Sequence, residues 1–323
     1  MLFFLTIVLW ILTLTVLTVT LLPMTTSPRW WIRMWDFPRI HILLTALAGI
    51  MLATLISGPV LTAVILIGCA VYQGIKILPY TLLTRQEVIF HQPNPHEPLI
   101  TLLASNVEME NTDHAKVADL ILREDPDVLL LMETDETWQV ALDDVLQTYP
   151  TVIAHPLSNH YGMIFATRLA APIAKTEFLA DDETPALLAE LVSQDGKHFH
   201  FIGLHPRPPV PGKDTEERDE QIKTAATLTR NSDLPVVAMG DFNDVAWAWS
   251  TTRFKHHGQF LDPRVGRGMM SSFDSRRPLL RFPIDQLFLT KGIRLVSYSL
   301  CDDVGSDHFP LKARICIEGR ERY

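Results

Sequence analysis

The sequence predicts an α/β domain, built of two mixed β-sheets packed face to face and flanked by helices, that is preceded by an all-α transmembrane segment. Charge divides the chain, because only five of its 28 Lys and Arg and one of its 37 Asp and Glu residues precede position 86. Residues 86–323 therefore hold 23 basic and 36 acidic residues, a net charge of −13. In this second part short apolar runs alternate with helical patterns and hairpin signals. We expect two domains, 1–85 and 86–323.

The first domain contains two long apolar stretches. The first, 2–22, has no charged residue and the length that an α-helix needs to cross a bilayer, and no basic start typical of a signal peptide precedes it. The second, 40–78, is too long for one span, and Gly58-Pro59 divides it into helices at 41–57 and 60–78. A single buried helical hairpin is the alternative for this second stretch.

The loop after the first expected span carries Arg29, Arg33 and Arg39. The positive-inside rule places this loop in the cytoplasm, and two further spans return the second domain to the same side. We therefore expect a multi-pass membrane protein with a cytoplasmic catalytic domain. Aromatic residues that favour the membrane interface lie at the expected span ends: Trp30, Trp31, Trp35 and Tyr80.

The second domain begins with alternating strands and helices. A strand at 99–106 ends in Asn106, and a helix follows from a Thr112 cap to Asp125-Pro126, with Val117, Leu120, Ile121 and Leu122 facing inward. A buried strand at 128–133 then ends in Glu133, and a helix at about 134–148 follows it.

Strands and short turns dominate the remainder. The expected strands are 151–155, 161–168, 186–193, 198–204, 235–240, 284–290, 293–300 and 310–317, with one helix at about 214–230. Asp195-Gly196 is a hairpin turn signal between two of these strands.

Polar residues recur where the expected strands end: Asn106, Glu133, His205, Asp241, Asn243, Asp285, Asp307 and His308. Taken singly, a terminal Asp or Asn is ordinarily a cap or turn former, and a lone His is ordinarily structural. Together they indicate one functional rim, since strand ends place loop side chains on one edge of a rigid scaffold.

The motifs around these residues resemble those of the endonuclease/exonuclease/phosphatase superfamily. They are, in order, Asn106, Leu131-Met-Glu133, Leu204-His205, Gly240-Asp-Phe-Asn243, Ile284-Asp285 and Ser306-Asp-His308, within a span of about 99–317. The resemblance implies a four-layer α/β sandwich and a hydrolase that cleaves a phosphoester with water and Mg²⁺, for which Mn²⁺ can substitute.

The resemblance also implies a role for each residue. Mg²⁺ prefers hard oxygen ligands, so Glu133 is the expected principal ligand, with Asp307 and the Asn106 amide oxygen beside it. Asp241 is expected to orient or deprotonate the attacking water, and Asn243 to position that water and a phosphoryl oxygen.

Two histidines and an arginine complete the expected site. His308 is expected to hydrogen-bond the phosphate while Asp285 fixes its ring and raises the pKa of its imidazole. His205 is expected to assist the leaving group, and Arg207 to contact substrate at the mouth of the site, unless its loop has no function. No Asn follows His205 closely, as it does in many nuclease members, and this makes DNA-repair specificity doubtful.

Three other features leave alternatives open. Seven Lys and Arg against two Asp between Arg253 and Arg281 either bind a phosphate-rich headgroup or the membrane surface, or form a solvated loop. Trp247 and Trp249 either stack on a base, line an apolar channel or pack in the core. The turn Asn159-His-Tyr-Gly162 either touches substrate or is an ordinary loop.

The function expected from these features is hydrolysis of a phosphoester or pyrophosphate in a phosphorylated small-molecule or lipid-linked substrate by a membrane-anchored enzyme. A nuclease is the first alternative, although an acidic domain disfavours nucleic acid as a partner. A membrane-tethered binding protein without activity is the second alternative.

Overall fold

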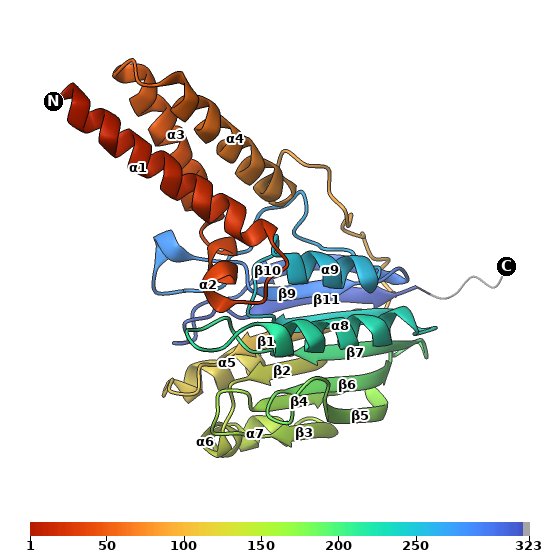
Figure 1. Ribbon diagram of the computed structural model, residues 1–323. Coiled ribbons are helices and arrows are strands. Elements are labelled where there is room, and N and C mark those ends of the chain that lie inside the picture. Colours follow the sequence, from red (N-terminus) through yellow and green to blue (C-terminus); the bar gives the residue numbers. More distant parts are fainter. Residues whose placement is uncertain (319–323) are drawn as a thin grey trace.

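The computed structural model describes residues 1–318. A bundle of three helices, α1 (Leu2–Leu21), α3 (Arg39–Leu55) and α4 (Val60–Ile77), projects from a larger α/β domain (Figure 1). Between α1 and α3 lie the short helices η1 (Leu22–Met24), α2 (Trp30–Arg33) and η2 (Met34–Asp36), and η3 (Leu78–Tyr80) follows α4. The C-terminal strand ends on the far side of the domain from the bundle.

Eleven strands form two mixed sheets in the described residues. The six-stranded sheet has the order β10-β11-β1-β2-β4-β3, and the five-stranded sheet has the order β5-β6-β7-β8-β9. The strands are β1 (Ile100–Asn106), β2 (Val128–Met132), β3 (Thr151–His155), β4 (Met163–Thr167), β5 (Ala170–Phe178), β6 (Pro185–Val192), β7 (His198–Leu204), β8 (Val236–Asp241), β9 (Asp285–Leu289), β10 (Ile293–Leu300) and β11 (Leu311–Ile317). Each sheet contains one parallel pair, β1 with β2 and β7 with β8.

The two sheets pack face to face and helices cover their outer faces, which confirms the four-layer sandwich. Alternate side chains from both sheets, such as Leu130, Phe165 and Phe201, form the central core. Helices α5 (His114–Glu124), α6 (Glu136–Ala141) and α7 (Asp143–Leu146) cover the first sheet through a second core. Helices α8 (Glu216–Arg230) and α9 (Trp249–His257) cover the second sheet through a third.

Several elements differ from the sequence predictions. Strand β5 and helix α9 were not predicted, since β5 is an edge strand with mixed polarity and α9 has only a narrow apolar face. The helix predicted at 134–148 is broken at Leu142 into α6 and α7. Leu122 is 60% exposed, and no side chain caps α5, whose N-cap residue is Asp113 rather than Thr112.

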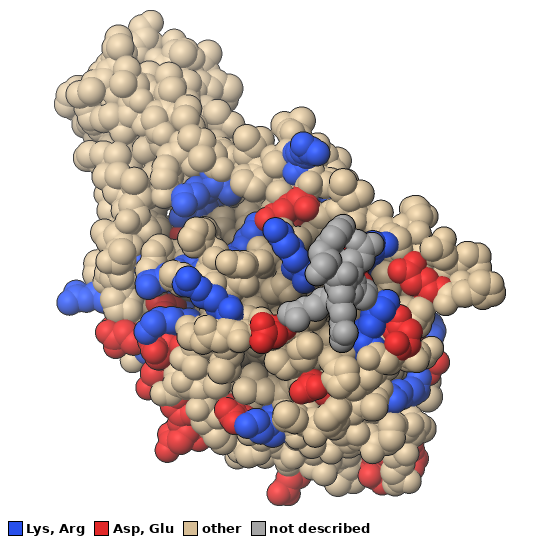
Figure 2. Space-filling model, turned by 90° about the vertical axis from the view of Figure 1, so that its right-hand side faces the viewer, with Lys and Arg blue, Asp and Glu red and all other residues tan. Residues whose placement is uncertain are grey.

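The N-terminal helices are apolar and long. Leu2–Met24 and Val60–Tyr80 are each long and apolar enough to cross a membrane. The predicted span at 41–57 corresponds to α3, which reaches such a length only together with Trp30–Asp36, and the two are bent by 72°. Figure 2 shows the bundle as an uncharged projection, with charged side chains confined to the rest of the visible face.

Many large apolar side chains point outward from the bundle, in addition to the apolar ones that form its core. Met51, Val64 and Ile75 are each more than half exposed. Gly49 packs where α1 and α4 approach, because an added Cβ would lie 2.7 Å from Leu12 and 2.8 Å from Leu66. A surface of this kind faces lipid more readily than water.

Buried polar residues connect the bundle at its foot, close to the α/β domain. Arg39 Nη1 donates to Gln73 Oε1 at 2.9 Å, and Gln73 Nε2 donates to Thr20 Oγ1 at 3.1 Å. Arg39 and Arg33 both pair with Asp36. These contacts join α1, α3 and α4 at one level.

The bundle packs directly on the α/β domain. The indole of Trp247 is 3% exposed and donates to the backbone oxygen of Asp36 at 2.7 Å, and the Tyr80 hydroxyl donates to Ala246 O at 2.7 Å. Trp247 is thus a core residue rather than a stacking platform, and Tyr80 is buried in this joint rather than at a membrane interface. Trp249 is half-buried between Arg33 and Arg253.

Candidate active site

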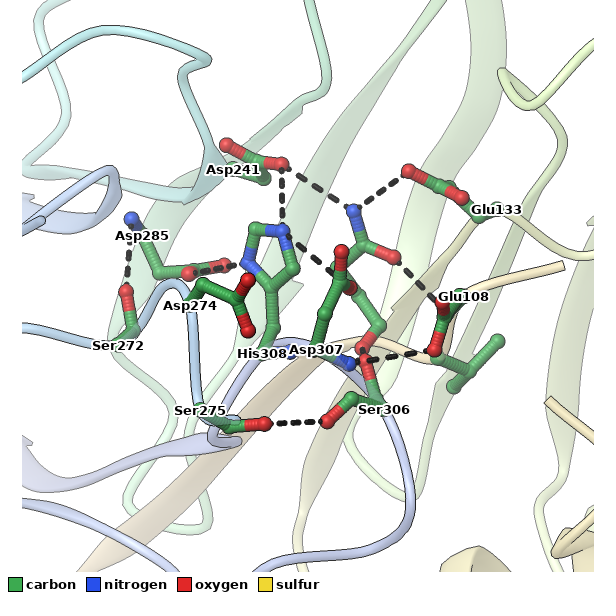
Figure 3. A network of polar contacts seen from close by, with 12 residues as sticks. Glu108, Glu133, Asp241, Ser272, Asp274, Ser275, Asp285, Ser306, Asp307 and His308 are labelled. Carbon is green, nitrogen blue, oxygen red and sulfur yellow. Dashed lines mark hydrogen bonds and ion pairs between the residues drawn. The ribbon is translucent and has the colours of Figure 1, made fainter. Parts of the chain in front are cut away.

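Four of the predicted site residues lie where the two parallel strand pairs end. Asn106 ends β1 opposite Met132 of β2, and Glu133 is the next residue. His205 directly follows β7, and Asp241 ends β8. Parallel strands that run side by side end at one edge, and the sheets are stacked, so these four side chains meet on one rim. Figure 3 shows Glu133 and Asp241 there.

The other strands that reach this rim start there. Asp285 is the first residue of β9 and lies opposite Asp241, its partner in the antiparallel pair. Asp307 and His308 lie in the turn a few residues before β11, which runs antiparallel to β1. Distant segments therefore deliver their polar side chains to the same place.

Left-handed backbone conformations are concentrated at the rim. Glu133 (φ 62°), Asn243 (φ 48°), Glu108 (φ 56°) and His160 (φ 69°) all have positive φ, which side chains with a Cβ adopt rarely. Each of these residues turns the chain sharply just after it leaves a strand or within a site loop. Such strain at several residues around one centre is typical of functional sites.

The Asn106 amide joins two carboxylates. Its Nδ2 donates to Glu133 Oε1 at 2.8 Å and to Asp241 Oδ2 at 3.2 Å, while its Oδ1 accepts from the Glu108 N–H at 3.0 Å. Ionised carboxylates only accept hydrogen bonds, so the amide nitrogen and not the predicted carbonyl oxygen faces them. Coordination of a metal by this oxygen would need the amide to turn.

His308 is held as a cation. Its Nδ1 lies 2.7 Å from Asp285 Oδ2, and its Nε2 lies 3.7 Å from Asp241 Oδ2 and 3.8 Å from Asp307 Oδ1. Burial disfavours the charged ring, but the surrounding carboxylates, Asp285 first, outweigh it and raise the pKa of His308 to about 10. The protonated ring can donate a hydrogen bond to a phosphoryl oxygen at neutral pH.

His205 is buried without a partner. The residue is 1% exposed, and neither of its ring nitrogens has a hydrogen bond among the described residues. Its Nε2 lies 3.7 Å from Asp241 Oδ2 and 3.9 Å from Glu133 Oε1, and the ring packs against Tyr161. Buried polar groups are rarely left unpaired, so this imidazole faces a position for water or a substrate oxygen.

Negative charge is concentrated at the centre of the rim. Burial, reinforced by nearby Glu108 and Glu133, raises the pKa of Asp307 to about 6, although His308 opposes this shift. Burial also raises the pKa of Asp241. In Glu133, by contrast, His205 and the Asn106 amide outweigh burial and hold the pKa below its usual value. A divalent cation would relieve this repulsion, so the donor set fits such an ion.

At the rim, two groups of side chains place ligand atoms within 4.8 Å of one another. One group is Glu110, Glu133 and His160, and it is partly exposed. The predicted ligand set was Asn106, Glu133 and Asp307, so the two sets share only Glu133. Its carboxylates suit Mg²⁺, and its imidazole suits transition metals better.

The second group is Asp241, Asp285 and His308, which is buried. Two of its members are hydrogen-bonded to each other, and the His308 ring is charged. A protonated imidazole has no lone pair for a metal, so these three residues are better suited to hold a proton near substrate. Glu133 is the carboxylate that the first group shares with the predicted ligand set.

Comparison with known proteins identifies this arrangement. The family model described as "Endonuclease/Exonuclease/phosphatase family" matches residues 103–308. The chain belongs to this family. It is accordingly a hydrolase of the phosphoesterase and nuclease class, in a family that typically depends on divalent metal. None of the curated proteins compared with the chain matches it.

Solved structures of other proteins share the fold. D. rerio TDP2 complexed with a single-strand DNA product is 16% identical with a TM-score of 0.57, covering 67% of this chain and 98% of that one. The Bacteroides thetaiotaomicron mannosyl-6-phosphatase is 18% identical with a TM-score of 0.53, covering 68% and 100%. The catalytic domain of human Nocturnin with bound sulfate is 18% identical with a TM-score of 0.54, covering 68% and 95%. At these identities the likeness shows the fold alone.

Hydrogen bonds hold the Asn243 amide in place beside the active site. Its Nδ2 donates to Pro206 O at 2.9 Å, and its backbone N–H donates to Asp241 Oδ1 at 2.8 Å. The Asp241 carboxylate is thus oriented by Asn106 on one oxygen and by Asn243 on the other. These bonds join the two loops that follow β7 and β8.

Arg207 has a crowded environment at the edge of the rim. Its guanidinium pairs with Asp181, Glu183 and Glu217 and stacks over the Tyr161 ring. These three acids balance its positive charge. The proposed substrate contact of Arg207 stays a prediction.

The sequence prediction omitted Glu108 and Glu110, which lie at the site. It left open whether His160 and Tyr161 contact substrate. Glu108 accepts from the Asp307 N–H and pairs with Arg276, and Glu110 lies 3.4 Å from His160. His160 Nδ1 lies 3.5 Å from Glu133 Oε2, and Tyr161 packs on His205. Glu108 and Glu110 lie within four residues of the end of β1 at Asn106. This nearness to a strand end is the sequence signal that could have found them.

Proposed function

We propose that this chain is a membrane-anchored, Mg²⁺-dependent phosphoesterase. It hydrolyses a phosphoester or pyrophosphate bond in a small or lipid-linked substrate by direct attack of water. The observation that carries this proposal is the unpaired, buried His205 imidazole, which faces the Asp241 and Glu133 carboxylates across the rim from the charged His308. This rim offers an acceptor for a water proton beside donors for phosphoryl oxygens.

Each side chain has a task in this proposal. Asp241, oriented by two amide donors, aligns the attacking water and accepts its proton. His308 donates to a phosphoryl oxygen, and His205 donates to the oxygen that leaves or to the charge that accumulates there. Glu133 with Asp307 would hold the metal ion, which when bound neutralises charge on the transferring phosphoryl group.

The substrate class is proposed from the rest of the molecule. The net charge of −13 on residues 86–323 repels long nucleic acid, whereas a bundle of apolar helices packed on the domain would keep the site near lipid. Of the related structures, one is a sugar phosphatase by its name and another was solved with single-strand DNA product. Both are compatible with a site for phosphate esters.

Full-length protein in detergent with Mg²⁺ is expected to release product from a panel of lipid phosphates, phosphodiesters and nucleic acids. Glu133→Gln should lower kcat by about 10²-fold or more, because it removes a ligand charge without changing shape. Glu136→Gln, on the exposed start of α6, is the matched control and should retain activity.

Other outcomes separate the alternatives. Faster cleavage of plasmid DNA than of any lipid phosphate would identify a nuclease instead. A folded protein without turnover on any substrate, with Mg²⁺ or with Mn²⁺, would leave only a binding role.

A further inference from the structure

One loop, Ser272–Phe282, connects the active-site rim to the foot of the helical bundle. On the rim side, Ser275 donates from its backbone N–H to Asp307 O at 2.8 Å and from its hydroxyl to Ser306 O at 2.7 Å (Figure 3). The Phe273 ring packs on His308 with 4.9 Å between ring centroids. Phe273 and Ser275, at the start of the loop, therefore form one wall of the site.

The other end of the loop contacts the start of α3. The Nε2 of His41 lies 2.7 Å from Leu279 O, and the Phe37 ring meets the Phe282 ring edge-on at 5.6 Å between centroids. Helix α3 begins at Arg39 and continues as an apolar helix away from the domain (Figure 1). The loop therefore lies at the level where the bundle leaves the domain.

The tip of this loop is apolar and exposed. Leu279 is 86% exposed and Leu280 is 44% exposed, next to Pro278, which restricts the backbone. Two adjacent leucines in water at the foot of an apolar bundle form a surface that favours a lipid or protein partner over water.

Basic residues flank the tip. Arg277 is 70% exposed and lies 3.4 Å from Asp274, Arg276 pairs with Glu108, and Arg281 donates to Ser275 O. The loop itself carries three Arg against the single Asp274, so it keeps net positive charge within an acidic domain. Apolar side chains next to arginines match the acyl chains and anionic headgroups of a bilayer surface.

We propose that the Ser272–Phe282 loop docks on the bilayer, with Leu279 and Leu280 inserted between lipids and the arginines among anionic headgroups. The loop thereby holds the mouth of the site against the membrane, so that a lipid-linked substrate enters the site from the bilayer surface. This inference rests on the proposed function, because it takes the bundle as a membrane anchor and the rim as a phosphoesterase site.

The kinetic test compares one headgroup presented in two ways. Full-length Leu279→Ser/Leu280→Ser is assayed on a long-chain lipid phosphate in anionic vesicles and on its short-chain analogue below the micelle concentration. We expect kcat/KM to fall about tenfold on vesicles, because inserted apolar area is lost, and to stay unchanged on the short-chain analogue. Leu228→Ser/Ile173→Ser, at residues with 43% and 50% exposure on α8 and β5, is the control and should leave both rates unchanged.

A second readout does not need turnover. Leu279→Cys carrying a fluorescent label, in full-length protein reconstituted into vesicles, should be quenched by brominated acyl chains, whereas labelled Leu228→Cys should not. The unsubstituted protein, with Cys69 and Cys316 buried and Cys301 half-buried, gives the background. Equal quenching at positions 279 and 228, as expected if a soluble protein covers the loop, would overturn the docking proposal. Quenching at 279 without hydrolysis of either substrate would overturn the proposed function instead.

Discussion

The two histidines of the rim have opposite surroundings. His308 is enclosed by the carboxylates of Asp285, Asp241 and Asp307, which hold it protonated, whereas His205 has no hydrogen-bonding partner within residues 1–318. An imidazole with a fixed proton suits a steady donor to phosphate, and an unpaired one suits a group that meets a ligand. Asp285 touches His308 and not the expected substrate position, so it is a positioning residue.

Asp285→Asn is expected to lower kcat by about 10²- to 10⁴-fold while leaving the fold intact. Asp285 is the largest of the influences that raise the pKa of His308. Without its charge, only Asp241 and Asp307 oppose the effect of burial, so the pKa of His308 falls. The alkaline limb of the pH–rate profile should therefore move to lower pH. A profile unchanged in shape would contradict the positioning role, and Asp302→Asn, at an exposed acid that pairs with Arg123, is the control.

At the scale of elements, the joint between the bundle and the domain depends on few contacts. The loop after β8 presents Trp247 to η2, and η3 presents Tyr80 to the same loop. Because Asp241 ends β8 and Asn243 lies in this loop, the foot of the bundle and the active site share one segment of chain.

Trp247→Phe is expected to destabilise the protein by about 1–3 kcal/mol, because it leaves the buried Asp36 carbonyl without its donor. Thermal unfolding of the detergent-solubilised protein, followed by circular dichroism, measures this change. Trp249→Phe, at a half-buried ring, is the matched control and should change the unfolding temperature less. If both variants unfold at the same temperature, the indole hydrogen bond does not stabilise the joint.

For the whole molecule, an apolar bundle packed on an acidic domain leads us to expect a location at the membrane. Outward-facing residues of α1 and α4 are mostly large and apolar, and charged residues begin at the foot of the bundle. Such a surface is costly in water and favourable in lipid, so the bundle is proposed as the anchor.

The proposed anchoring predicts that the chain stays in the membrane pellet after alkaline carbonate extraction and is released by detergent. With the proposed cytoplasmic domain, external protease should leave residues 86–323 intact in spheroplasts and degrade them after lysis. Release of the chain by carbonate would contradict spanning helices, and cleavage in intact spheroplasts would reverse the orientation.

The sequence by itself determined the fold class and the residues that meet on the rim. Short apolar runs such as Val128–Met132 favour buried strands, and a polar residue just after such a strand lies where the strand ends. The order of Asn106, Glu133, His205, Asp241 and His308 along the chain sufficed to indicate the family. Local pattern failed for β5 and α9, whose apolar faces are too weak to distinguish them from loops.

Tertiary structure alone decided the surroundings of each group. Hydrogen bonds between residues far apart in sequence turned the Asn106 nitrogen toward Glu133, and packing left His205 unpaired. Ion pairs neutralised Arg207, and Trp247 became the contact between bundle and domain. Burial, pairing and pKa depend on distances across the fold, which a linear pattern does not contain.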